Sequence, residues 1–444
     1  MKNRYLSLDL LIKLGSEYHL NYSDLEYKFI NYYNSISKTQ KKDLSLLGDT
    51  KNFAYLLYLI FLISPFNLVI QLFFKFYYQY LAHTKVLLNV NNSGIHLWQD
   101  FKNLKDVNLL AIDSFTTKFF AKKLPFKYSI FILKNYLYLL YQNFKFKKFK
   151  ENTYLFDLEV FRKFLNDYMF GCFLGSIKTT TILEGAAYTL NLPKYLGIKK
   201  INKIIKVVAF QFHAASTEPS MSLFQADKIL SINKNTSLNI PQVFGNRAEE
   251  SVGSRCLINF VYKSNRPIKY NPNKKSFLIL LGNSMHPKGE FYGPSHYQIY
   301  HTFLNNLIRL SKEFNFWDFY FLEHRTVEFR YEFDYFKNTP IKYLNKNSNV
   351  YEETLKHLFV VTFGSTLVPE LFPHHPNLYM YSPSSESPFR VTDKKFRFIS
   401  SYETLVMKLH LAEKKFNEDL YDYNFLPIIN PQYFENNVFN SALL

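Results

Sequence analysis

Short hydrophobic runs separated by longer mixed segments recur along the chain from about residue 86 onward. Runs rich in β-branched and aromatic residues that stop at glycine, asparagine or charged residues predict buried strands. The spacing leaves room for a helix between successive strands, as at residues 297–314, and this alternation predicts parallel βαβ units. The strands expected from the pattern are residues 86–90, 107–113, 172–183, 207–212, 228–232, 276–281, 319–322 and 358–363.

The expected strands form two groups, which predicts an α/β fold with two Rossmann-like domains. A polar segment at residues 263–275 separates the groups and has the composition of a linker. The length of 444 residues also exceeds what one ordinary core contains. The predicted parts are a helical N-terminal region at 1–85, an N-terminal domain at 86–262, a C-terminal domain at 276–400, and C-terminal helices at 401–444 that pack back across the interface.

Two segments predict that the N-terminal part associates with a membrane. Residues 53–74 contain no charged side chain and are long enough to span a bilayer, although Pro65 and Asn67 interrupt them, and a pair of buried helices is the alternative. Phenylalanine and lysine alternate at 144–150, which is typical of a helix on anionic lipid, of a site for single-stranded nucleic acid, or of a solvated helix end. The nearby apolar run favours lipid.

The overall charge narrows the class of partner. The formal net charge is +18, from 54 basic and 36 acidic residues, so anionic lipid, nucleic acid or phosphorylated substrates are the expected partners. Two cysteines exclude a disulfide framework, which favours a reduced compartment. The first residues lack the apolar core and cleavage site of a signal peptide.

Polar residues that follow two strands form the main candidate site. The run 319–322 leads into Glu323-His324-Arg325, and the run 358–363 breaks at Gly364-Ser365-Thr366 before Pro369 and Glu370. Carboxyl ends of parallel strands meet at one edge of a sheet, where ligands of open α/β sheets bind. A helix that starts there offers free N–H groups and the positive end of its dipole, which predicts an anion site.

The order of these motifs resembles the C-terminal half of GT-B glycosyltransferases. The most similar groups are bacterial capsule and lipooligosaccharide sialyl- or Kdo-transferases and CDP-glycerol glycerophosphotransferases. Residues 207–216 and 225–231 are similar to the segment that joins the two halves in those families. The resemblance implies that His324, Ser365 and Thr366 hold the donor phosphates and that Glu370 accepts hydrogen bonds from the ribose. The donor-binding residues expected in this way are His324, Arg325, Gly364, Ser365, Thr366 and Glu370.

The general base that deprotonates the acceptor hydroxyl has only weak candidates. Asp113 and Glu184 follow predicted strands, and His213 lies where the two halves join. For Glu184 the alternative is a helix-terminal acid that the helix dipole favours. The chain has no DxD motif, no zinc-type pairing of histidines with a carboxylate and no GxGxxG fingerprint, so neither a metal nor a cofactor is expected. The resemblance agrees, because GT-B enzymes need no metal.

The resemblance, together with the net charge and the two membrane segments, implies a glycosyltransferase at the cytoplasmic face of the inner membrane. Its expected partners are a nucleotide-sugar donor, with a CMP-sugar favoured, a glycan or lipid-linked acceptor such as a surface polysaccharide or lipooligosaccharide, and the anionic membrane surface. One alternative is a non-catalytic membrane-surface protein that uses Rossmann-like units as a scaffold. A basic nucleic-acid-binding protein is the other alternative, and the position of the phenylalanine and lysine segment disfavours it.

Overall fold

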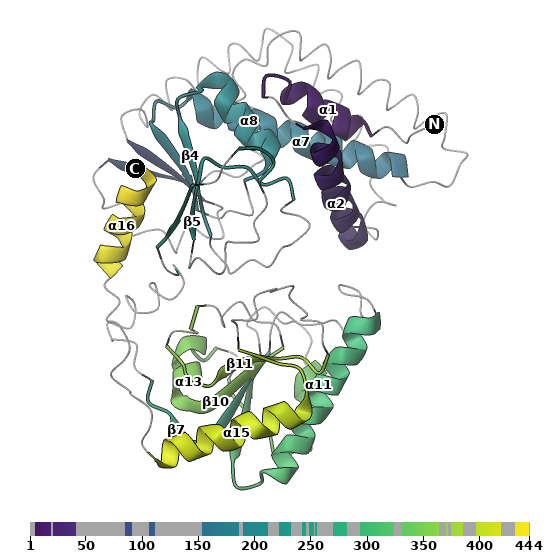
Figure 1. Ribbon diagram of the computed structural model, residues 1–444, viewed down its shortest axis with the longest axis vertical. Coiled ribbons are helices and arrows are strands. Elements are labelled where there is room, and N and C mark those ends of the chain that lie inside the picture. Colours follow the sequence, from purple (N-terminus) through teal and green to yellow (C-terminus); the bar gives the residue numbers. More distant parts are fainter. Residues whose placement is uncertain are drawn as a thin grey trace.

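Two parallel six-stranded sheets, each flanked by helices, make up the core of the protein (Figure 1). The arrangement is mixed α/β, as two Rossmann-like domains require. The computed structural model describes residues 5–18, 21–40, 85–90, 106–111, 153–185, 190–211, 222–231, 242–245, 248–252, 254, 270–281, 294–323, 331–345, 347–363, 370–371, 374–384, 397–418 and 431–443.

The first sheet has the strand order β2-β1-β3-β4-β5-β6, and every neighbouring pair is parallel. Its strands are β1 (Val86–Val90), β2 (Val107–Ala111), β3 (Thr181–Glu184), β4 (Lys206–Phe210), β5 (Lys228–Ser231) and β6 (Ala248–Ser251). The helices α1 (Leu6–Leu14), α2 (Tyr22–Gln40), α7 (Thr153–Ser176) and α8 (Leu192–Ile201) belong to the hydrophobic cluster on one face. The C-terminal helix α16 (Pro431–Leu443) packs on the other face.

The second sheet has the order β12-β11-β10-β7-β8-β9 and is also parallel throughout. Its strands are β7 (Asn273–Leu280), β8 (Asp318–Leu322), β9 (Lys342–Tyr343), β10 (His357–Thr362), β11 (Leu378–Tyr381) and β12 (Phe398–Ile399). One face is covered by α11 (Pro294–Glu313), α12 (Tyr331–Phe336) and α15 (Tyr402–Asn417), and the other by α13 (Val350–Lys356). All six residues of β10 are buried, as a strand covered on both faces requires.

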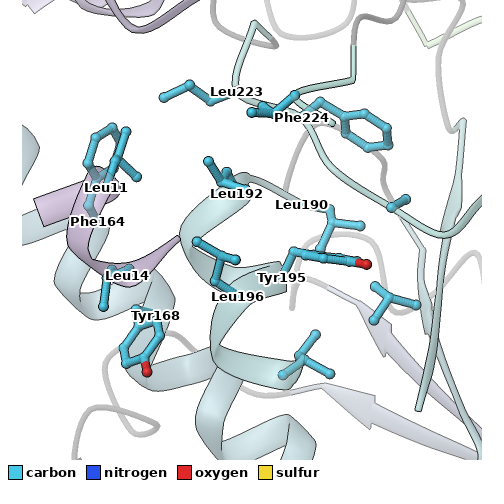
Figure 2. Packing of buried hydrophobic residues seen from close by; sticks show 14 of the residues in the cluster. Leu11, Leu14, Phe164, Tyr168, Leu190, Leu192, Tyr195, Leu196, Leu223 and Phe224 are labelled. Carbon is cyan, nitrogen blue, oxygen red and sulfur yellow. The ribbon is translucent and has the colours of Figure 1, made fainter. Parts of the chain in front are cut away.

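Glycines bring α7 and α8 into backbone contact. A Cβ atom added to Gly171 of α7 would lie 2.0 Å from the carbonyl oxygen of Lys194, and one added to Gly197 of α8 would lie 2.1 Å from that of Tyr168. Only glycine permits so close an approach. Around this crossing, leucines of α1 and α8 and aromatic side chains of α7 pack together (Figure 2).

Polar contacts attach the C-terminal helix to the first sheet. The Nζ atom of Lys228 in β5 donates to the carbonyl oxygen of Ser441 at 2.7 Å and lies 2.8 Å from the carboxylate of Glu250. The Ser441 hydroxyl donates to the same carboxylate at 2.6 Å. A lysine at the last carbonyl groups of a helix also interacts favourably with the helix dipole.

The strand prediction for residues 172–183 is wrong for most of its length. Cys172 lies inside α7, and only the residues from Thr181 onward belong to a strand. Residues 172–175 are buried in the helix, as they would be in a strand. A short run that is buried on all sides has no period that separates a helix from a strand.

The two predicted membrane segments, 53–74 and 144–150, lie outside the described residues. Within the part of the chain that the structure describes, no helix combines the length and apolar composition that a bilayer span needs.

We expect Gly171→Ala to lower the free energy of unfolding by about 2 kcal/mol or more, because the new methyl group forces the two helices apart. Chemical denaturation measures the change. Gly245→Ala is the control, since its Cβ would meet nothing within 4 Å and only the backbone φ of +74° opposes it. A loss at Gly171 no larger than at Gly245 would contradict the close crossing.

Candidate functional site

The second sheet reverses its strand order between β7 and β10. From β7 the chain adds β8 and β9 on one side and then β10, β11 and β12 on the other, which is the 3-2-1-4-5-6 order of dinucleotide-binding sheets. Sheets of this kind bind ligands beyond the carboxyl ends of the strands at the reversal. The carboxyl side of β7 and β10 is therefore the candidate donor site.

The register of the strands aligns their carboxyl ends. Leu280 of β7 is paired with Thr362 of β10 on one side and with Leu322 of β8 on the other. The segments that begin after β8 and β10 therefore start at the same edge of the sheet. Five predicted donor-binding residues follow these strands in sequence and lie outside the described residues: His324, Arg325, Gly364, Ser365 and Thr366.

Glu370 is the predicted donor-binding residue that the structure describes. It is helical and only 5% exposed, and its Oε2 accepts a hydrogen bond of 2.8 Å from the hydroxyl of Tyr351 in α13. The Ser254 side chain also hydrogen-bonds to this carboxyl group. Burial raises the pKa of Glu370 to about 7, and the two hydroxyl partners partly oppose the shift.

The contact between Ser254 and Glu370 joins the two halves of the chain. Ser254 is 5% exposed and lies three residues beyond the end of β6 in the first sheet. Glu370 lies eight residues beyond the end of β10 in the second sheet. The contact therefore places the carboxyl end of β6, an edge strand of the first sheet, next to the carboxyl ends of the strands in the second sheet.

A second buried carboxyl group near the same edge was missed by the sequence analysis. Glu332, in the first turn of α12, is 2% exposed, and its Oε1 accepts a hydrogen bond of 2.7 Å from the Tyr300 hydroxyl. The Tyr300 ring packs edge-on against Phe363, directly after β10. Burial raises the pKa of Glu332. In the sequence Glu332 is one of several acidic residues in an aromatic stretch, and no local pattern predicts that it is buried.

The first sheet has its own reversal, between β1 and β3, and Glu184 lies there. Glu184 is the last residue of β3 and is paired in register with Asn89 of β1, whose Nδ2 donates to both carboxylate oxygens at 3.0 and 3.1 Å. The Nζ atom of Lys194 in α8 lies 2.7 Å from Oε1, and both side chains are almost fully buried. The carboxylate thus ties two strands and a helix together.

These contacts give Glu184 a structural role. A general base needs a lone pair that the acceptor hydroxyl can reach, whereas Glu184 is 0% exposed and faces an ammonium group and an amide. Its role as a base stays a prediction. The other two candidates, Asp113 and His213, lie outside the described residues.

The segment 225–231, which carries part of the family resemblance, is structural in its described contacts. Asp227 accepts hydrogen bonds from Tyr195 at 2.7 Å, Lys199 at 2.6 Å and the backbone of Val207 at 2.7 Å. It precedes β5 and therefore lies at the amino edge of the sheet, away from the reversal. Its contacts hold α8 against β4 and β5.

Three buried histidines lie at the amino edge of the second sheet. His357 begins β10, and His374 and His375 precede β11. Burial lowers the pKa of each, to about 4 for His357 and His374 and to about 3 for His375. The His375 Nδ1 accepts from the Asn377 backbone at 3.1 Å, which requires a neutral ring. In the described ranges no three metal-binding side chains come together.

The comparisons with known proteins are weak. No family model matches the chain, and no curated protein matches it. The UDP-GlcNAc 2-epimerase from Neisseria meningitidis, solved with UDP-GlcNAc bound, is similar over 81% of this chain and 100% of its own, with a TM-score of 0.43 and 9% identity. The wall teichoic acid polymerase TagF is similar over 89% of this chain and 98% of its own, with a TM-score of 0.38 and 10% identity. Likenesses this distant carry no argument about function, which has to rest on the site.

We expect Glu184→Gln to cost about 3–5 kcal/mol of stability, because it leaves the Lys194 ammonium buried without a counter-charge. The double variant Glu184→Gln/Lys194→Met should be more stable than the single variant, and urea denaturation measures both. Asp318→Asn, which breaks the exposed pair with Lys342, is the control and should cost far less. Equal losses in the single and double variants would contradict a buried pair.

Glu370→Gln should stabilise the protein by roughly 1–3 kcal/mol at pH 8 and have little effect at pH 4. The folded pKa of about 7 lies above the ordinary 4.5, so the folded state binds more protons between these values. The contribution of Glu370 to the free energy of unfolding of the wild type is therefore fully present below pH 4.5 and is lost as the pH rises through 7. Thermal melting across this range tests the sign. If the stability of Glu370→Gln relative to the wild type does not increase as the pH rises, the pKa of Glu370 is not raised in the folded protein.

Proposed function

We propose that the protein is a metal-independent glycosyltransferase of GT-B type that uses a nucleotide-activated sugar, with a CMP-sugar favoured. The observation that carries the proposal is the reversal between β7 and β10 in a sheet of 3-2-1-4-5-6 order. The segments that follow β8 and β10 in the sequence contain a histidine, an arginine, a serine and a threonine, and Glu370 follows them. Such groups suit a nucleotide with its phosphates at this edge.

In the proposed reaction the bond between the anomeric carbon and the donor phosphate breaks, and a bond to an acceptor hydroxyl oxygen forms. The departing phosphate carries the negative charge, which the side chains of His324, Arg325, Ser365 and Thr366 would stabilise. The acceptor hydroxyl loses its proton to a base. Because Glu184 is ion-paired with Lys194, Asp113 and His213 are the bases that we propose to test first.

The acceptor is proposed to be a glycan or a lipid-linked sugar held against the first sheet. The proposed location is the cytoplasmic face of the inner membrane, with residues 53–74 and 144–150 at the anionic surface. Support for acceptor and location comes from the apolar and basic composition of these two segments.

Calorimetry with CMP, CDP, UDP and GDP tests the proposal. We expect CMP to bind the wild-type protein, and His324→Ala or the double change Ser365→Ala/Thr366→Ala to weaken binding by about ten- to a hundredfold, since a charge-assisted hydrogen bond contributes roughly 1.5–3 kcal/mol. His410→Ala on α15 is the matched control and should leave the affinity unchanged. Absence of binding by all four nucleotides would overturn the transferase and leave the non-catalytic alternative.

A further inference from the structure

The amino ends of three neighbouring strands meet at the backbone of His357 and Leu358, the first two residues of β10. The His357 carbonyl oxygen accepts a hydrogen bond of 3.0 Å from Nε2 of His375, which lies three residues before β11. The Leu358 carbonyl oxygen accepts one of 3.2 Å from the hydroxyl of Tyr270, which lies three residues before β7. The start of β10 is therefore joined to the segments that lead into both of its neighbours.

Both ring nitrogen atoms of His375 are in use, and their partners fix the protonation state of the ring. The backbone N–H of Asn377 donates to Nδ1 at 3.1 Å, so Nδ1 carries no hydrogen. The hydrogen of the neutral ring is then on Nε2, which donates it to the His357 carbonyl oxygen. A second proton on Nδ1 would point at the hydrogen of the Asn377 amide group. A charged ring therefore has to break this contact.

The surroundings of His375 also disfavour a positive charge. The residue is 1% exposed, and the Tyr270 ring packs against its imidazole at 4.7 Å with an interplanar angle of 68°. The other groups that face it are the guanidinium group of Arg397, which donates to the His375 carbonyl oxygen, and the imidazole of His357. The first is positive and the second becomes so in acid, so both oppose protonation of His375.

The residue that His375 holds belongs to the same set of contacts. The side-chain amide of Asn377 donates to the Leu358 carbonyl oxygen at 3.0 Å, and its backbone carbonyl oxygen accepts from the N–H of Val360 at 3.0 Å. Asn377 is thus held by the His375 ring and by the first turns of the pairing between β10 and β11. Loss of the ring contact would weaken this end of the sheet.

We propose that His375 is an acid-sensitive latch: its neutral ring joins the segments before β7 and β11 to the start of β10, and its protonation releases them. The segment before β7 is the end of the stretch that connects the two sheets along the chain. Release therefore frees the point at which this stretch is attached to the second sheet. The latch needs no ligand at the carboxyl edge and does not depend on the proposed function.

The sign of the pH dependence follows from the closed and open states. Burial lowers the pKa of His375 from the ordinary 6.5 to about 3 in the closed state, whereas in the open state the ring is solvated and its pKa is about 6.5. The open state therefore binds more protons between these values, so the latch is fully effective above pH 6.5 and weakens as the pH falls. One such histidine makes opening about tenfold more frequent at pH 5.5 than at pH 7.5.

Amide hydrogen exchange of the full-length protein tests the latch, once the rates are corrected for the intrinsic pH dependence of exchange. At the amide groups of Asn377 and Val360 we expect opening to be about tenfold or more frequent at pH 5.5 than at pH 7.5, since His357 and His374 are also buried at this edge. His375→Gln has no ring to charge and should reduce this rise by about tenfold. His410→Gln, on the exposed side of α15, is the matched control and should keep the wild-type rise.

Three results would overturn the latch: opening that does not depend on pH, a rise that is the same in His375→Gln and the wild type, or an equal rise at the amide groups of β3, which would show that acid unfolds the whole protein. The nitrogen chemical shifts of the wild-type imidazole decide the matter if His375→Gln does not fold. We expect a neutral ring with its hydrogen on Nε2 at pH 5, and a charged ring at this pH would contradict the proposal.

Discussion

The first sheet depends on the close crossing of α7 and α8. Gly171 and Gly197 let the two backbones touch, and the contact passes through Lys194, whose carbonyl oxygen lies against Gly171. The side chain of the same lysine extends to Glu184 at the reversal between β1 and β3. A buried ion pair is stable only if its geometry is good and its remaining hydrogen bonds are made. Asn89 supplies two of those bonds, so helix packing and strand pairing support each other.

Glu184 and Glu370 are buried carboxyl groups on the carboxyl sides of the first and second sheet, and their partners differ. Glu184 faces a lysine ammonium, so its charge is compensated within the protein. Glu370 has the hydroxyl groups of tyrosine and serine as its described partners, and burial raises its pKa to about 7 although these hydrogen bonds oppose the shift. A compensated charge favours a fixed structure, whereas a carboxyl group held by hydroxyl donors can exchange them for those of a ligand. The ion pair gives Glu184 a structural role in the first sheet, whereas binding at the second edge stays a prediction.

Most strands were predictable because fully buried parallel strands are continuous apolar runs. β10 and β7 illustrate this, since each ends in buried branched or aromatic residues. Four strands, β6, β9, β11 and β12, were not predicted. The edge strands β6 and β9 read AEES and KY and show no apolar run, and β12 has two residues. β11, which reads LYMY, is buried but only four residues long. The helix that contains Cys172 was taken for a strand for the opposite reason, since residues 171–175 are all buried and none of them is polar or charged.

Local sequence determined where strands end and which polar residues follow them, because a strand stops where glycine or charge interrupts an apolar run. It therefore placed Glu184 at the end of a strand and Glu370 after the break at Gly364. Only the tertiary structure decided which partners these carboxyl groups meet. Lys194 and Ser254 come from segments that are ten and 116 residues away in the chain from Glu184 and Glu370, respectively. Their contacts arise from helix packing and strand order, which no local pattern encodes.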